Sequence, residues 1–516
     1  MILKKRMKIK QLIEKYGEEK TRQYLQHRFS RIEPSAFWEF ARTIYGEKME
    51  DETPDFHKEI IRIIIEDFKK NGYFYIGRNA FGAPRGGAKS TLLGTLFLSW
   101  VALNGFLRHV IYCSDTYKKA IALSSPLRKQ VETNKRLQFI YPEAKNSQTW
   151  GKEGFVINGL KGECLIVPIG AGMNVRGASE DNIRPQLAIL DDMENLELVY
   201  SKERRQKLQD WLDFDLEPAM DRRHKNIIYV GTILHYHSLL KQVLNQEGKY
   251  KSWKTRVFKA LENGKSFWES RFSAEYLTAI KDDPTHPDYV GSIVFAQEYQ
   301  NEPQDDKDRI IKMDWIKEYN YNEAWRKVEG ISDDERKKKF RASLEITGGV
   351  DTAISEKEGA DNFSFYTYGF DKVSAKEYML DVIHGKFPDI NEQVKVICDG
   401  IQNWGHDTVG IESVAYQQGL YKLVRQELQR RRIYKTQVKP IKTDKDKIRR
   451  AKIHSSAFEG GFILLRADHP KCGIIRSEIE EFPLGKHDDA FDSLMLAREA
   501  RQKPRARAFA EKPEGF

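Results

Sequence analysis

The chain has 516 residues and a net charge of +10, because 86 lysines and arginines outnumber 76 aspartates and glutamates. This length exceeds one ordinary hydrophobic core and predicts two domains, and the basic charge is compatible with a polyanionic partner without proving one. Four widely separated cysteines with no CxxC spacing suggest neither a disulfide framework nor a four-ligand zinc site. No window approaches 18 consecutive apolar residues, so the sequence predicts no membrane-spanning helix. We therefore expect a protein of a reducing cytosol with no membrane partner.

The first half of the chain alternates helices and strands. Residues 56–70 have apolar positions at helical spacing and end at Asn71–Gly72, after which 73–76 reads as extended. A second helical run follows Ser90 and closes at Gly105. Buried strands are predicted at 109–113, 186–190 and 226–230. This order is typical of an α/β protein with a parallel sheet.

A charged stretch separates this half from a second α/β region. We place a first domain at 1–305, with a basic helical extension at 1–50, and a linker at 306–341. The second domain is predicted at 342–501 and a basic tail at 502–516. Within the second domain a helix is expected at 391–404, and strands at 343–351, 363–370, 377–383, 408–412, 438–441 and 462–465.

A glycine-rich segment, GAPRGGAKST, begins at Gly82 between a predicted strand and a helix. Backbone amides and a helix N-terminus in this position cradle phosphates. The segment departs from the strict GxxxxGK[ST] pattern because Ala88 stands between Gly87 and Lys89, and a structural turn is the alternative. In a phosphate loop, Lys89 would neutralise the β and γ phosphates and Ser90 would offer its hydroxyl to Mg²⁺. The expected nucleotide-binding residues are Arg85, Gly86, Gly87, Ala88, Lys89, Ser90, Thr91, Asp191 and Thr232.

Acidic residues follow the next buried strand. Asp191 comes directly after the apolar run and is expected to hold Mg²⁺ beside the loop. Either Asp192 or Glu194 would be the catalytic base, and a solvated acidic turn is the alternative for the whole run. Thr232, at the end of the 226–230 strand, is placed to sense the γ phosphate.

The second domain contains a scattered set of acids. Asp351 and Glu412 end predicted neighbouring strands, and Asp488 and Asp492 lie four residues apart on one helix face, from which Asp489 points away unless it precedes the helix. Two divalent ions need several such carboxylates to clamp a phosphodiester and activate water. We expect Asp351, Glu412 and Asp488 to be catalytic and all five acids to bind metal. Each acid alone is more typical of a surface or capping residue.

The stretch 425–452 is dense in lysine and arginine. Such a stripe could follow a DNA backbone, and a solvated pair of helices is the alternative.

The motifs together resemble the bacteriophage terminase large-subunit family, over residues 55–500. The segment APRGGAKST, with Arg85, looks like the family's deviant Walker A motif, and RPQLAILDDMEN looks like its Walker B motif. VGTILHYHSLL resembles the coupling motif and FAQEYQNEPQD the segment that closes the motor domain. The nuclease acids of the family are matched by VDTA, GIES and KHDDAFD.

The resemblance implies an N-terminal P-loop ATPase of the additional-strand class and a C-terminal RNase H-like nuclease. It implies ATP with Mg²⁺ in the motor, two Mg²⁺ or Mn²⁺ ions in the nuclease, and double-stranded DNA as the substrate. The implied partners are a portal protein, a small terminase subunit and further copies in a pentameric ring on the procapsid. The protein would work in the host cytoplasm and be absent from the mature virion. A neighbouring subunit would supply an arginine, for which the candidates are Arg176, Arg204, Arg205, Arg222 and Arg223.

Two other functions compete with this interpretation. A helicase or translocase with a fused nuclease, acting in repair or defence, would share both chemistries. We find no second RecA-like domain between Gly231 and Asp351, which counts against it. A DNA-binding scaffold without catalysis would use the glycine loop and the acids only structurally.

Overall fold

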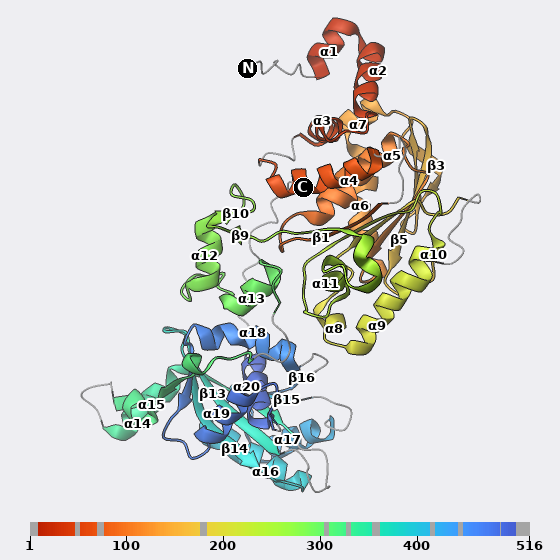
Figure 1. Ribbon diagram of the computed structural model, residues 1–516. Helices are drawn as coiled ribbons and strands as arrows, with labels where there is room; N and C mark the ends of the chain where they lie inside the picture. Colours follow the sequence, from red (N-terminus) through yellow and green to blue (C-terminus); the bar gives the residue numbers. More distant parts are fainter. Residues whose placement is uncertain are drawn as a thin grey trace. The chain divides into compact units, whose positions relative to one another are not determined.

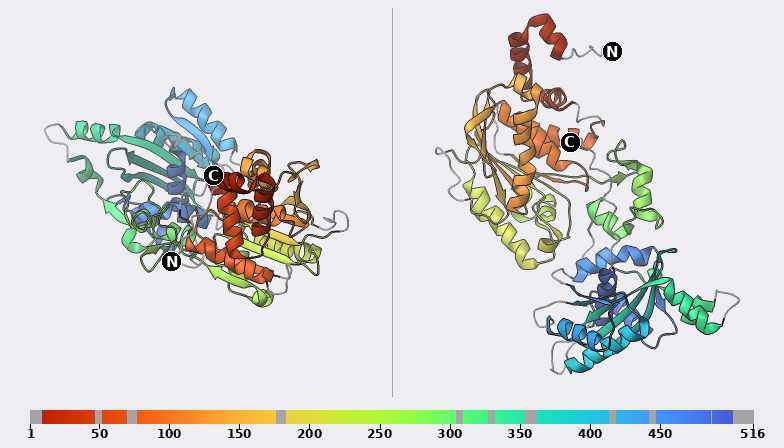
Figure 2. Two further views of the ribbon diagram at one scale, coloured as in Figure 1. Left: turned by 90° about the horizontal axis from the view of Figure 1, so that it is seen from above. Right: turned by 180° about the vertical axis from the view of Figure 1, so that it is seen from behind.

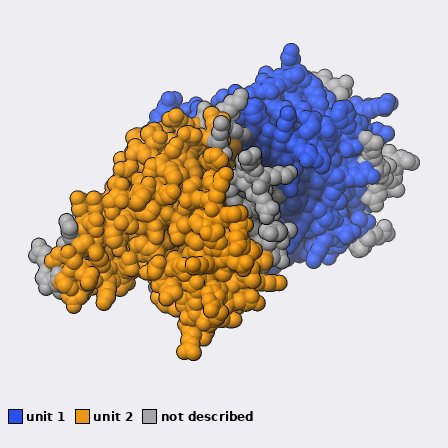
Figure 3. Space-filling model, turned by 90° about the horizontal axis from the view of Figure 1, so that it is seen from below, with its two compact units in different colours: residues 1–278, 295–303, 516 blue, residues 279–294, 304–515 orange. Residues whose placement is uncertain are grey.

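The computed structural model describes residues 9–46, 52–69, 77–175, 183–303, 309–326, 332–352, 362–412, 418–441, 447–485 and 487–501. The chain divides into two compact units, coloured separately in Figure 3. Unit 1 comprises residues 1–278 and 295–303, and unit 2 comprises 279–294 and 304–515. No helix within the described ranges is long and apolar enough to cross a membrane.

Unit 1 is built on an eight-stranded sheet with the order β3-β4-β5-β2-β6-β7-β1-β8. The strands from β5 to β8 in this order run parallel, whereas β3 and β4 add an antiparallel edge. The predicted strands at 109–113, 186–190 and 226–230 are confirmed, and the extended run 73–76 lies outside the described residues. The strands are β1 (Gly77–Gly82), β2 (His109–Ser114), β3 (Lys145–Trp150), β4 (Phe155–Gly159), β5 (Gly162–Gly170), β6 (Leu187–Asp191), β7 (Asn226–Gly231) and β8 (Lys254–Val257).

Helices cover both faces of this sheet, as Figures 1 and 2 show. Alternate strand residues enter two separate cores: Tyr112 and Ile189 belong to one, and Ile111 and Leu190 to the other. The first core holds residues of α2 (Glu18–Phe29), α3 (Pro34–Tyr45), α4 (Asp55–Lys69), η2 (Thr91–Phe97), α5 (Leu98–Leu103), α6 (Tyr117–Thr133) and α7 (Lys135–Ile140). The second holds residues of α9 (Lys202–Asp210), η3 (Trp211–Leu216), α11 (Leu239–Leu244) and η4 (Gly248–Ser252).

The N-terminal extension is part of the first core rather than an appendage. Phe29 and Phe37 are fully buried in it, and the Trp100 indole donates to the Phe29 carbonyl over 2.8 Å. Residues 1–8 of the predicted extension lie outside the described residues.

Unit 2 contains a seven-stranded mixed sheet with the order β11-β17-β14-β13-β12-β15-β16. β12, β13 and β14 are antiparallel neighbours, and β15 and β16 extend β12 in parallel. All six strands predicted for this domain are confirmed. The strands are β11 (Lys317–Tyr319), β12 (Leu344–Asp351), β13 (Phe363–Asp371), β14 (Glu377–Gly385), β15 (Thr408–Glu412), β16 (Gln437–Ile441) and β17 (Ile463–Arg466).

Two helical layers cover the sheet of unit 2. One core includes residues of α18 (Lys447–Glu459), α19 (Cys472–Glu481) and α20 (Asp489–Ala500), and another includes residues of α16 (Ile390–Trp404) and α17 (Gln418–Arg430). Helix α20 lies very close to β12, because a Cβ on Gly349 would come within 2.1 Å of the Ser493 carbonyl oxygen. The glycine therefore permits this contact.

The segment expected to be a linker belongs to unit 2. Strand β11 pairs with β17, and α14 (Tyr321–Arg326) and α15 (Asp333–Ala342) also fall in this unit, although 306–308 and 327–331 are not described. The high charge suggested a linker, but Trp325 and Tyr321 are buried in a small core with Leu344. The first domain also ends differently, because residues 279–294 belong to unit 2. The basic tail 502–516 lies outside the described residues.

A buried histidine makes unit 2 sensitive to acid. His406 contacts the Thr367 hydroxyl at 3.2 Å, and burial lowers its pKa to about 3. The unfolded chain binds a proton near pH 6.5 whereas the folded chain does not, so this stabilisation is complete above pH 6.5 and is lost as the pH falls towards 3. We expect His406→Asn to be less stable than the wild type at pH 7.5. Between pH 7.5 and 4.5 it should lose about 1–3 kcal/mol less stability than the wild type, as measured by urea unfolding.

Equal losses in both proteins over this pH range would contradict the assignment. His286→Gln, at a partly exposed position of the same unit, is the control.

Candidate functional sites

The glycine-rich segment forms a tight loop between β1 and η2. Gly86 has a φ of +76°, and a Cβ there would meet the Phe272 ring at 2.9 Å. Ala88 also has a positive φ, of +51°, which an alanine adopts at a cost of roughly 1–2 kcal/mol. The departure from the strict motif therefore leaves a left-handed residue directly before Lys89.

Lys89 is buried at the base of this loop. Its ammonium donates to the Pro84 carbonyl over 3.1 Å and to the Thr232 hydroxyl over 3.0 Å. Thr232 in turn donates to the Ala83 carbonyl over 3.2 Å. The structure thus brings together Lys89 and Thr232, which are 143 residues apart in the chain.

Asp191 ends β6 and is completely buried next to the same loop. Tyr112 donates a hydrogen bond to its Oδ2, while Oδ1 has no hydrogen-bond partner within the described ranges. Burial raises its pKa to about 6, the charge of Asp192 adds to the rise, and Ser90, Tyr112 and Lys89 oppose it. A buried carboxylate oxygen without a donor, beside a serine hydroxyl, fits a magnesium ligand set.

The strand order explains this meeting. β7 lies between β1, which leads into the loop, and β6, which ends at Asp191. The carboxyl ends of these parallel strands meet at one edge of the sheet, where open α/β sheets bind ligands. An inserted strand between the loop strand and the aspartate strand is the arrangement expected of the additional-strand class.

Glu194 has a structural position that the sequence did not predict. Its Oε1 accepts from the Leu239 amide over 2.7 Å, and its Oε2 accepts from the Leu240 amide over 2.9 Å and from the Tyr229 hydroxyl over 3.0 Å. Both oxygens are therefore used to cap the start of α11, an arrangement that disfavours Glu194 as the catalytic base. Asp192 remains the candidate, because it is only half-buried and lies beside Asp191.

Two substitutions separate these roles. We expect Asp192→Asn to slow ATP hydrolysis by a factor of about 100 to 10,000, the usual contribution of a general base. Glu194→Gln should change hydrolysis less than tenfold but lower the free energy of unfolding by about 1–3 kcal/mol, because an amide group replaces one acceptor of the α11 cap. Steady-state phosphate release and thermal unfolding measure the two effects. The opposite ranking of the two hydrolysis rates would restore Glu194 as the base.

Two further residues at the loop escaped the sequence analysis. His57, in α4, donates from Nε2 to the Gly87 carbonyl over 2.8 Å, and burial lowers its pKa to about 4, so it is neutral near pH 7. Glu298, in α13 (Gly291–Glu298), is close to Arg85, with 3.9 Å between Oε2 and Nη1. Burial raises the pKa of Glu298, and Arg85 and Lys89 oppose the rise. The only signal for Glu298 was its position in the segment FAQEYQNEPQD.

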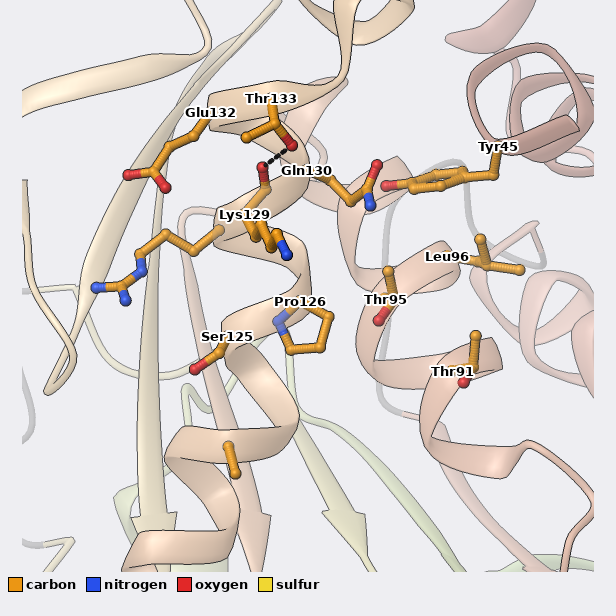
Figure 4. A pocket seen from close by; sticks show the side chains of 12 residues that line it. Tyr45, Thr91, Thr95, Leu96, Ser125, Pro126, Lys129, Gln130, Glu132 and Thr133 are labelled. Carbon is orange, nitrogen blue, oxygen red and sulfur yellow. Dashed lines mark hydrogen bonds between the residues drawn. The ribbon is translucent and has the colours of Figure 1, made fainter. Parts of the chain in front are cut away.

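Thr91 does not join the residues around Lys89 and Asp191. It lines a separate cavity of about 680 Å³, shown in Figure 4. The cavity lies between η2 and α6, and Thr95, Lys129 and Thr133 also line it. Thr133 donates to the Lys129 carbonyl over 2.8 Å. We do not assign this cavity to the nucleotide.

The arginine candidates differ in availability. Arg205 donates a hydrogen bond to the Val199 carbonyl, so its guanidinium is already engaged. Arg204, Arg222 and Arg223 are exposed. Arg176 lies outside the described residues.

The acids of unit 2 come together at one end of its sheet. β12 and β15 run in parallel with Val350 opposite Ile411, so the next residues, Asp351 and Glu412, lie side by side. Asp351 is buried, and burial together with the charges of Asp492 and Glu412 raises its pKa well above the usual range. Two carboxyl groups this close repel each other when both are ionised, so the pair favours binding either a proton or a metal cation.

Lys447 links this pair to the last helix. Its ammonium lies 2.8 Å from Asp488 Oδ1 and 2.7 Å from Asp492 Oδ2. Asp488 is the N-cap residue of α20, and Asp492 lies one turn later on the same side, as the spacing predicted. Burial raises the pKa of Asp492 to about 6, with Lys447 opposing and Asp488 adding to the rise.

Asp489 has different neighbours from the other four acids. Its Oδ2 accepts from the Asn362 amide over 3.3 Å, and its charge acts on His384. Asp351, Glu412, Asp488 and Asp492 therefore form one group, called here the carboxylate cluster, and Asp489 lies apart from it.

The basic stretch 425–452 is not one continuous surface. Arg450 and Lys452 are buried, and Arg450 contacts Glu499 at 3.2 Å. Arg430 and Arg431 both pair with Glu427. Residues 442–446 are not described. The expectation of a uniform phosphate-tracking stripe is therefore wrong for its last part, because those side chains pack inside unit 2.

The carboxylate cluster fits divalent cations by its donor set. Oxygen ligands on two strand ends and one helix are what Mg²⁺ and Mn²⁺ prefer. Asp492 Oδ1 is buried and has no hydrogen-bond partner in the described part of the chain, although it lies 3.6 Å from Arg450 Nη1 in an ion pair.

Comparison with known proteins supports the assignment of this unit. Residues 348–500 match the family model of the terminase RNaseH-like domain. No curated protein matches the chain.

Several solved structures are also similar. The large terminase of a thermophilic bacteriophage in complex with ADP is 10% identical, covers 81% of this chain and 93% of its own, and gives a TM-score of 0.48. The large terminase nuclease of the thermophilic phage G20c with bound zinc is 17% identical over 37% of this chain and 98% of its own, with a TM-score of 0.27. The terminase nuclease domain of human cytomegalovirus is 14% identical over 37% of this chain and 94% of its own, with a TM-score of 0.27.

The family model covers the β12–β15 strand pair and helix α20, which carry the carboxylate cluster. Residues 348–500 thus belong to the family of terminase RNaseH-like domains.

Proposed function

We propose that this protein is a terminase large subunit that uses ATP hydrolysis to drive double-stranded viral DNA into a procapsid and cuts concatemeric DNA when packaging starts and ends. The observation that carries the proposal is the presence, in one chain, of the phosphate loop beside Asp191 and of the carboxylate cluster in a terminase RNase H-like domain. Neither site alone distinguishes a packaging enzyme from other nucleases or ATPases.

In the motor unit each residue has a role set by its contacts. Lys89 is held by the Pro84 carbonyl and Thr232, so its charge is directed to the phosphates that the loop amides bind. Ser90 and Asp191 would hold Mg²⁺, which neutralises the phosphate charge that develops during transfer. Asp192 would take the proton of the attacking water. Thr232 connects the Lys89 ammonium to the end of β7, and through this bond the loop can sense phosphate release.

In the nuclease unit the carboxylate cluster would hold two Mg²⁺ or Mn²⁺ ions, whose charge stabilises the attacking and leaving oxygens of the phosphodiester. Asp351, on which the charges of both Glu412 and Asp492 act, would be a ligand of these ions. Lys447 holds Asp488 and Asp492 in position and offers a positive charge to the DNA backbone.

The proposed partners follow from the resemblance to the terminase large-subunit family. They are double-stranded DNA, a portal protein, a small terminase subunit and further copies of the chain in a ring, which we take to be a pentamer. The protein would act in the host cytoplasm, docked transiently on the procapsid and absent from the mature virion.

The first experiment is plasmid cleavage by the purified protein with and without Mn²⁺, beside Asp488→Asn. We expect metal-dependent cutting that the substitution abolishes. Packaging is then measured as DNase-protected DNA after mixing the protein with procapsids, portal, small subunit and ATP. Cutting and ATPase activity without any protected DNA would favour a nuclease-linked translocase of repair or defence.

A further inference from the structure

A second group of possible metal ligands lies apart from the carboxylate cluster. One ligand atom from each of His384, Glu478 and Asp489 falls within 4.8 Å of the others. His384 comes from β14, Glu478 from α19 and Asp489 from the first turn of α20, elements that are labelled in Figure 1. The group therefore joins three elements of unit 2.

Glu478 is the residue that points to a ligand. The side chain is only 6% exposed, and its Oε2 accepts from the Ala490 amide over 2.8 Å and from the Phe491 amide over 3.0 Å, which caps the start of α20. Its other oxygen, Oε1, is buried and has no hydrogen-bond partner within the described residues. A buried carboxylate oxygen left without a donor costs free energy unless something compensates it.

His384 presents a similar feature. Its Nδ1 is buried and also has no hydrogen-bond partner in the part of the chain that the structure describes. Burial lowers the pKa of His384, Lys471 and His487 lower it further, and Asp489 opposes them. A neutral imidazole is the form that binds metal.

Asp489 completes the group and is already oriented. The backbone amide and the side-chain amide of Asn362 both donate to its Oδ2, over 3.3 Å and 3.4 Å. Ligands held by such outer hydrogen bonds bind metal with less loss of freedom. With Glu478, Asp489 gives the group two carboxylates beside one imidazole, a set of ligands whose negative charge a divalent cation would neutralise.

We propose that His384, Glu478 and Asp489 bind one divalent transition-metal ion, with Zn²⁺ preferred over Mg²⁺. Ligand atoms about 2.1 Å from one tetrahedral ion lie about 3.4 Å apart. The three ligand atoms, which lie within 4.8 Å of one another, would therefore approach by up to about 1.4 Å on binding. The imidazole nitrogen favours Zn²⁺, because Mg²⁺ prefers oxygen ligands. The ion would tie the start of α20, which carries Asp488 and Asp492, to β14 and α19. The site is separate from the carboxylate cluster and does not depend on the proposed function.

The test is Zn²⁺ binding by the full chain, measured by competition with a chromophoric chelator. An Asp351→Asn background weakens the carboxylate cluster, so that a site elsewhere is counted separately. We expect one Zn²⁺ per chain in this background, and at least a tenfold loss of affinity on adding Glu478→Gln or His384→Gln. Glu478→Gln retains a carbonyl oxygen for the α20 cap, and His286→Gln should leave binding unchanged.

The outcomes are distinct. Unchanged Zn²⁺ affinity in both double variants would overturn the proposal, as would displacement of Zn²⁺ by equimolar Mg²⁺. If circular dichroism shows that Glu478→Gln unfolds the chain, His384→Gln decides alone, because its Nδ1 makes no described hydrogen bond that the substitution would break. If the wild-type protein binds Zn²⁺ but does not cut plasmid DNA, the result would count against the proposed nuclease and not against this site.

Discussion

Lys89→Ala is expected to reduce ATP hydrolysis by a factor on the order of 100 to 1,000 while metal-dependent DNA cutting is largely retained. Removing one preorganised charge from a site where negative charge develops typically has an effect of this size. Lys89 is buried and held by Pro84 and Thr232, so the loss should appear mainly in turnover and in phosphate affinity. The measurements are phosphate release and plasmid cleavage by the same preparation.

Lys118→Ala is the matched control for this experiment. Lys118 is an exposed lysine at the start of α6 in the same unit. It should hydrolyse ATP at the wild-type rate. If Lys89→Ala lost cutting and hydrolysis to the same degree, the model of two independent sites would fail. If Lys89→Ala hydrolysed ATP at the wild-type rate, the glycine-rich loop would be a structural turn and not a nucleotide site.

Asp351→Asn is expected to reduce DNA cutting roughly a thousandfold and to leave ATP hydrolysis within twofold of the wild type. The charges of Glu412 and Asp492 both act on this carboxylate. Metal ions that stabilise a transition state contribute several kcal/mol, and each 1.36 kcal/mol is about tenfold in rate. Neutralising this acid also removes repulsion from its buried neighbours, so we expect the folded protein to be at least as stable as the wild type. Plasmid nicking with Mn²⁺ and thermal unfolding measure these effects.

Asp314→Asn, at an exposed carboxylate of unit 2, is the control and should cut DNA like the wild type. Persistent nicking by Asp351→Asn would mean that the carboxylate cluster is not the nuclease site. A loss of stability together with loss of cutting would instead indicate a structural role for Asp351.

Local sequence patterns predicted most of the strands and the residues of the two candidate sites. Buried strands of parallel sheets are short apolar runs, so 109–113 and 226–230 were readable without any tertiary information. Asp191, Asp351 and Glu412 each follow such a run directly, and strand ends gather at one edge of a sheet. The antiparallel edge formed by β3 and β4 was not predicted, because its residues are too polar and irregular to show a clear period of two.

The sequence by itself therefore determined the α/β class, the position of the glycine-rich loop and the acids available for metal binding, since these depend on residue type and short-range spacing. Only the tertiary structure decided which acids act together. Glu194 and Asp192 are two residues apart, yet α11 uses both oxygens of Glu194 and leaves Asp192 free of that cap. Asp488 and Asp489 are adjacent, yet one faces Lys447 and the other Asn362, because Asp488 is the N-cap residue before α20 and Asp489 is the first residue of the helix. Such choices depend on contacts between residues distant in the chain, which local spacing does not encode.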